Sequence, residues 1–105
     1  MLTYSSAFAA LADPTRRAVF ERLRGSPRSV RQLADSLPVS RPAVSQHLRV
    51  LKEAGLVKAA RDGNRSLYRI DARGLEDLRA YVDRFWTDVL DGYEKAAREK
   101  GEKEK

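Results

Sequence analysis

The sequence has no cysteine, one histidine and one tryptophan among its 105 residues. Without cysteine, the chain can form neither a disulfide framework nor a thiolate metal site. No stretch approaches the roughly 20 apolar residues that a membrane-spanning helix needs, and the chain does not open on a basic region followed by an apolar run. We therefore expect a cytoplasmic protein with no membrane partner.

The length leaves room for one small domain, because 105 residues cannot form two independent cores. At this size, a self-complementary dimer is a common way to bury more apolar surface. We expect the domain to span residues 1–98. Residues 99–105 alternate in charge and contain no apolar side chain, so we expect them to form a disordered tail.

Positive charge is concentrated in the middle of the chain. Residues 14–73 carry 14 Lys and Arg against 5 Asp and Glu, whereas residues 74–105 carry 7 against 9. The central segment therefore carries +9, more than the +6 of the whole chain. This distribution indicates that the centre binds a polyanion and that the C-terminal segment has a different role.

One central helix has marked ends. Ser40 is a favoured N-cap, Pro42 falls in the first turn, where its missing N–H costs nothing, and Gly55 can close the helix. Apolar residues recur at helical spacing along one side: Val44, Leu48 and Leu51. We call the segment between Ser40 and Gly55 the reading helix.

The opposite side of the reading helix can donate hydrogen bonds and has no bulky apolar group. Its residues are Pro42, Gln46, Arg49 and Glu53, with Arg41 and Ser45 on its flank. Such a face suits the edges of base pairs in the major groove of DNA. A solvated surface helix is the alternative interpretation, and the neighbouring segments decide between the two.

Three shorter helices are predicted before the reading helix. Tyr4, Phe8 and Leu11 have helical spacing in the first, and Asp13 followed by Pro14 begins the second. The third begins with a capping box of Ser29 and Gln32. The tight connection over residues 37–40 then makes the third helix and the reading helix a helix-turn-helix.

A β-hairpin is predicted after the reading helix. Residues 56–61 and 66–70 read as strands, and the four residues between them contain Asp-Gly and Gly-Asn, which favour hairpin turns. Arg61 and Arg65 lie near the tip. A basic hairpin at this place is typical of a wing, which contacts phosphates or enters a minor groove.

A long amphipathic helix is predicted from near residue 71 or 74 to about residue 98. It carries two apolar rows, more than a terminal helix of a small monomer needs. Packing under the first helix is the alternative, but two rows favour a second copy of the chain. The interface residues predicted on the first and last helices are Tyr4, Phe8, Leu11, Phe85, Trp86, Val89, Leu90 and Tyr93.

The predicted fold is mainly α with a β-hairpin wing, in the order α-α-α-α-β-β-α. Residues 11–17, residues 40–57 and the wing residues Arg61, Gly63, Arg65 and Tyr68 resemble the ArsR/SmtB family of bacterial winged helix-turn-helix repressors. The resemblance implies a homodimer joined through its first and last helices. It also implies repression at an operator with imperfect two-fold symmetry, relieved by an inducer.

The chain departs from the metal-sensing members of that family. The predicted third helix has no cysteine, and the aspartates of the last helix have no histidine beside them. Unaided carboxylates make poor zinc or nickel sites, so we expect no metal, no cofactor and an inducer that the sequence does not identify. His47 falls at the edge of the apolar stripe, where a packing role is favoured over a phosphate contact, with a metal ligand third.

Two functions fit these patterns, and neither is enzymatic, because no catalytic triad, nucleophilic cysteine or phosphate-binding glycine loop is present. The first is a sequence-specific, dimeric repressor that binds double-stranded DNA. The residues predicted to contact DNA are Ser40, Arg41, Pro42, Ser45, Gln46, Arg49, Arg61 and Arg65. The alternative is a winged-helix interaction module that binds a protein, or DNA without sequence preference.

Overall fold

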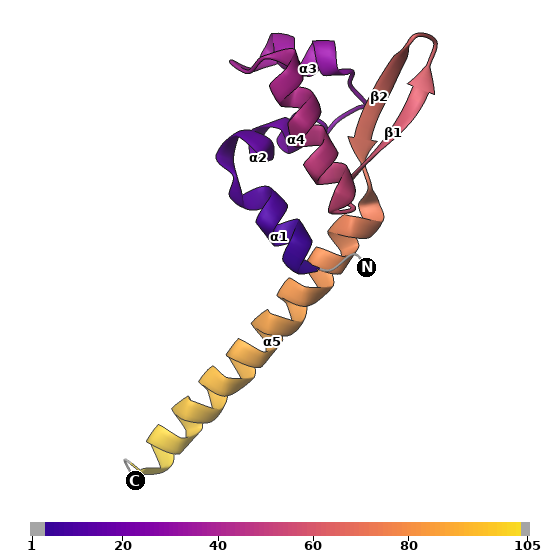
Figure 1. Cartoon of the computed structure of the whole chain (residues 1–105). Helices are drawn as coiled ribbons and strands as arrows, with labels where there is room; N and C mark the ends of the chain where they lie inside the picture. Colours follow the sequence, from indigo (N-terminus) through magenta and orange to yellow (C-terminus); the bar gives the residue numbers. More distant parts are fainter. Residues whose placement is uncertain (1–3, 104–105) are drawn as a thin grey trace.

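The computed structural model describes the backbone of residues 4–103 and the side chains of residues 6–101. Within that range, five helices and a two-stranded sheet follow the predicted order (Figure 1). The elements are α1 (Tyr4–Ala12), α2 (Pro14–Glu21), α3 (Val30–Ser36), α4 (Arg41–Glu53), β1 (Val57–Asp62), β2 (Arg65–Ile70) and α5 (Ala72–Lys103). In Figure 1, α1 to α4 and the hairpin form a head from which α5 extends.

The core of the head lies around α4, which is the reading helix. Its predicted apolar stripe is fully buried, with Val44, Leu48 and Leu51 at 0% exposure. α4 packs against both α2 and α3, which contribute Val19 and Leu33 to the same core. Complete burial of a leucine or valine side chain stabilises a fold by about 1.5–3 kcal/mol, so this packing fixes α4 within the head.

The predicted N-caps set where three helices begin. The carboxylate of Asp13 accepts hydrogen bonds from the amides of Thr15 and Arg16, at 2.8 and 3.0 Å. Ser29 and Gln32 form both bonds of the capping box, at 3.2 and 2.9 Å. The fourth helix follows the same rule, because its Ser40 hydroxyl accepts from the first turn. Each cap satisfies an amide that would otherwise have no partner.

The turn of the hairpin is shorter than predicted, because two residues connect the strands instead of four. Asp62 pairs with Arg65, so only Gly63 and Asn64 form the turn. Gly63 has a φ of +64°, which the first central residue of such a turn requires. The register continues to Val57 opposite Ile70 at the base.

Two glycines bring α5 against the end of the reading helix. Gly55 has a φ of +78° and closes the turn after α4. A Cβ at Gly74 would overlap the carbonyl group of Gly55, so a larger residue could not be placed there without a shift. α5 then buries Leu78 in the head, and beyond Tyr81 its described side chains are exposed.

The last helix extends further than we predicted. We expected the last helix to end near Arg98, but α5 continues through Lys103, and residues 104–105 lie outside the described part of the chain. Lys95 and Glu99 are four residues apart, and opposite charges at this spacing favour a helix. The continuation gives the molecule a longest dimension of 72 Å against 27 and 23 Å. Within residues 4–103, no helix is long and apolar enough to cross a membrane.

Candidate nucleic-acid interface

The outer face of α4 comprises Pro42, Gln46, Arg49 and Glu53, with Arg41 and Ser45 on its flank. All six side chains are exposed, and the four of the outer face lie opposite the fully buried stripe of the same helix. The core therefore fixes the apolar side of α4, while the polar face of the helix is accessible to a partner. An α-helix fits the width of the B-DNA major groove, so this face has the size and the hydrogen-bonding groups needed to reach base edges.

Two residues of this helix have partners within the chain. The Nε of Arg49 lies 3.3 Å from the Oε1 of Glu53, and both side chains are about two-thirds exposed or more. An exposed pair of this kind contributes at most about 1 kcal/mol, so Arg49 can leave Glu53 for a base edge at little cost. The hydroxyl of Ser40 accepts from the amide of Ala43 at 3.3 Å. Ser40 therefore acts first as a helix cap, and its hydroxyl hydrogen remains available to a partner.

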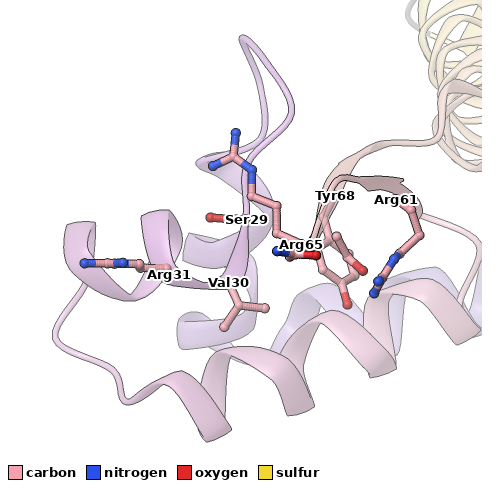
Figure 2. A pocket seen from close by; sticks show the side chains of 8 residues that line it. Ser29, Val30, Arg31, Arg61, Arg65 and Tyr68 are labelled. Atoms are coloured by element: carbon pink, nitrogen blue, oxygen red, sulfur yellow. The ribbon is translucent and has the colours of Figure 1, made fainter.

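The hairpin presents Arg61 and Arg65 on opposite faces. Arg61 lies across from Ser66, whereas Arg65 lies across from Asp62, and side chains alternate between the two faces of a strand. The Nη2 of Arg65 lies 3.7 Å from the Oδ2 of Asp62. In Figure 2 the two arginine side chains point in different directions. The structure therefore places both arginines at the wing tip, as predicted, but on separate faces.

A groove of about 450 Å³ separates the wing from the first turn of α3. Arg61 and Arg65 line one side of the groove, and Arg31 lines the other (Figure 2). Sequence reasoning did not select Arg31. The available signal was its place in the first turn of the helix before the reader, since that helix crosses the DNA backbone in a helix-turn-helix.

His47 occupies the edge of the core, where the sequence placed it. The residue is partly buried, and its Nδ1 is buried without a hydrogen bond in the described part of the chain. Among the described residues, no three His, Cys, Asp or Glu side chains come together as a metal site. Independence from metals stays a prediction.

The apolar rows of α5 lie on the surface of the single chain. Its large exposed side chains are Leu75, Val82, Phe85, Trp86, Val89, Leu90 and Tyr93. Trp86 is 60% exposed and Tyr93 is 77% exposed. Contiguous exposed apolar patches usually mark an interaction site, so this surface of α5 is a candidate interface.

The predicted interface residues of the first helix differ in exposure. Phe8 is exposed and Leu11 is half-buried, while the side chain of Tyr4 lies outside the described residues. The ring of Phe8 meets Tyr81 of α5 edge to face, with centroids 5.5 Å apart, and Tyr81 stacks on Phe85 at 6.3 Å. Tyr81, which sequence reasoning did not select, thus joins the apolar surfaces of α1 and α5.

The chain is similar to known transcriptional regulators. A family model described as a helix-turn-helix domain matches residues 11–59. The HTH-type transcriptional regulator Rv2034 of Mycobacterium tuberculosis is 56% identical over 96 residues, covering 89% of this chain and 90% of that protein. The HTH-type transcriptional repressor SmtB of the same species is 51% identical over 61 residues, covering 58% of this chain and 45% of the repressor.

A solved structure shows the same architecture. It is the solution structure of the homodimeric winged helix-turn-helix DNA-binding domain of Mb0332 from Mycobacterium bovis, a possible ArsR-family transcriptional regulator. That domain is 30% identical, with a TM-score of 0.66, over 83% of this chain and 81% of that chain. With the order of elements and the relatives above, this similarity shows that the chain belongs to the ArsR/SmtB family of winged helix-turn-helix transcriptional regulators.

Proposed function

We propose that the protein is a sequence-specific repressor that binds operator DNA as a homodimer. The observation that carries the proposal is the two-sided reading helix, with a fully buried apolar stripe behind an exposed polar face. Gln46 can pair with adenine through two hydrogen bonds, and Arg49 can pair with guanine in the same way. Ser45 and Arg41 lie on the flank of this face, in the N-terminal half of the helix.

The exposed apolar surface of α5 supports a homodimer. Trp86 and its neighbours would be costly to leave in water and have no cover within the described chain. A second copy provides a matching surface, because a two-fold interface uses the same patch twice. The Mycobacterium bovis relative is itself described as homodimeric. Two reading helices related in this way would bind half-sites about 34 Å apart, one turn of DNA.

Repression follows from where such a dimer would sit. A dimer bound across a promoter occupies the DNA that the transcription machinery must reach. The relative SmtB, which shares half of its aligned residues with this chain, is named a repressor. A compound that lowers the affinity of the dimer for DNA would relieve the block.

Selection from a random DNA library tests the proposal directly. The purified protein should enrich a sequence with imperfect two-fold symmetry, and at physiological salt it should bind that sequence about a thousandfold or more tighter than scrambled DNA of equal composition. The alternative function, coating DNA without preference or binding a protein, predicts no enrichment. Equal affinity for the selected and scrambled duplexes would refute sequence-specific recognition.

A further inference from the structure

The groove between the wing and the first turn of α3 is held in a fixed shape. The backbone amide of Arg28 donates to the carbonyl of Tyr68 at 2.9 Å, and the amide of Tyr68 donates back to Arg28 at 2.8 Å. This isolated bridge lies just before the N-cap of α3, so it ties that helix to β2. The two sides of the groove are therefore positioned before any partner binds, which lowers the cost of ordering them.

The groove is lined by positive charge alone. Three arginines contribute to its walls, and none of the described side chains that line it is acidic. Two other hollows of the head differ in this respect, because Glu53 lines one and Glu21 lines the other. The carboxylate of Asp62 belongs to the wing and lies beside Arg65, but it does not line the groove. The groove is therefore suited to an anion.

The arrangement of the arginines favours an extended anion over a compact one. Figure 2 shows Arg31 directed away from the hairpin, while Arg61 and Arg65 point in different directions on the other side. Guanidinium groups spread in this way do not converge on one small ion. They do match a strand of DNA, which presents a phosphate for about every 3.4 Å of helix axis.

We propose that this groove binds successive phosphates of one DNA strand, and that Arg31 supplies the contact from α3. The inference rests on the proposed function and adds a second anchor to it, between the wing and the first turn of α3. Arg31 and Arg61 then hold the strand from two elements about 30 residues apart in sequence. Because these two arginines contact the DNA backbone, they position the reading helix and carry no sequence preference of their own.

The test compares Arg31→Gln and Arg31→Lys with Arg24→Gln, a control that removes an exposed arginine from the loop after α2. Affinity for the selected duplex and for scrambled DNA is measured from 50 to 200 mM KCl. The slope of log affinity against log salt is negative, and loss of one phosphate contact should make it shallower by about 0.9. The ratio of wild-type affinity to Arg31→Gln affinity should therefore shrink about 3.5-fold across that range. Arg31→Lys should retain most of the slope, and Arg24→Gln should retain all of it.

The outcomes separate this inference from the proposed function. An unchanged slope in Arg31→Gln, with wild-type selectivity intact, would overturn the phosphate contact and leave the repressor proposal standing. A loss of affinity confined to the selected duplex would also overturn the phosphate contact, since removing such a contact weakens binding to both DNAs by the same factor. Wild-type protein that selects no sequence would instead refute the proposed function. Competition by pyrophosphate at constant ionic strength, absent in Arg31→Gln, would show a compact anion site and overturn the assignment to a DNA strand.

Discussion

Gln46 and Arg49 carry the prediction that most directly concerns base recognition. Both are exposed on the outer face of α4, and neither contributes to the core. Replacing either with alanine should therefore weaken binding to the selected duplex by about 1–3 kcal/mol and have much less effect on scrambled DNA. Binding titrations on both duplexes measure this difference, with Arg24→Ala as the control.

Equal losses of affinity for the two duplexes would contradict this prediction. If Gln46→Ala or Arg49→Ala weakened binding to both duplexes equally, the side chain would contact phosphate alone. For Arg49, the ion pair with Glu53 provides an internal comparison, because Glu53→Ala removes its partner without removing the guanidinium group. Normal selectivity in Glu53→Ala would show that the pair is not needed to orient Arg49.

Asp13 makes the stability of the head depend on pH at the acid end. Hydrogen bonds from the backbone amides of Arg16 and Thr15 hold the pKa of the Asp13 carboxyl below its ordinary value of 3.8, with the amide of Arg16 the largest cause. The folded state therefore holds this proton less tightly than the unfolded state does. The contribution of the cap is fully present above pH 3.8 and is lost as the pH falls through the lower native pKa.

Asp13→Asn tests this effect, because asparagine also caps helices well but does not titrate. Near neutral pH the variant should melt close to the wild type. As the pH falls from about 5 to below the native pKa, the melting temperature of the wild type should fall further than that of the variant. Asp71, whose pKa is lowered by its hydrogen bond with Arg73, is present in both proteins and cancels in the comparison. Parallel curves for the two proteins would contradict the role of the charged cap.

Among the elements, the helices were predictable because their ends are marked by local chemistry. Asp13, Ser29 and Ser40 each accept from an amide in the first turn, and such short-range bonds depend on few other residues. The hairpin was predictable in kind but not in detail. Arg61 lies opposite Ser66 whether two or four residues form the turn, but Arg65 belongs to a strand, and so to a face, only because Asp62 pairs with it. A one-residue change of register would have reversed one of the faces.

The wing should act through charge and without sequence preference. Arg61→Ala and Arg65→Ala, made singly and together, should weaken binding to all duplexes alike, with about one unit of salt slope lost for each phosphate contact removed. Arg61 lines the groove beside α3, whereas Arg65 has Asp62 as a partner in the free protein. Titrations at several salt concentrations measure each contribution. An unchanged slope in the double variant would remove the wing from the interface.

At the scale of the whole molecule, the sequence indicated an excess of apolar surface on the last helix, and the structure locates that excess. Leu78 is the residue of α5 that the head buries, and the apolar side chains after it are exposed from Val82 to Tyr93. Periodicity alone could not assign this division, because both rows have helical spacing. It follows from the direction in which α5 leaves the head, which the contact between Gly55 and Gly74 helps to set. Tyr81 sits at the boundary and was therefore missed.

That division defines which part of α5 can be changed without unfolding the head. Trp86 is 60% exposed and lies beyond Tyr81, so a substitution there removes no contact of the buried core. Thr87 is the next residue, also exposed, and its hydroxyl donates to the carbonyl of Asp83 within the helix. Adjacent helical residues point about 100° apart. Thr87→Asp is therefore a matched control that adds the same charge outside the apolar rows.

Trp86→Asp should abolish both the dimer and tight operator binding. In the proposed dimer, the substitution places a carboxylate in an apolar seam, where an unpaired charge is strongly unfavourable. A monomer would keep a folded head but would lose the second half-site, and with it most of the affinity for the selected duplex. Light scattering should find wild type and Thr87→Asp dimeric at micromolar concentration and Trp86→Asp monomeric, with circular dichroism unchanged. A monomeric wild type that binds the selected duplex tightly would contradict the homodimer, because one reading helix would then account for the affinity.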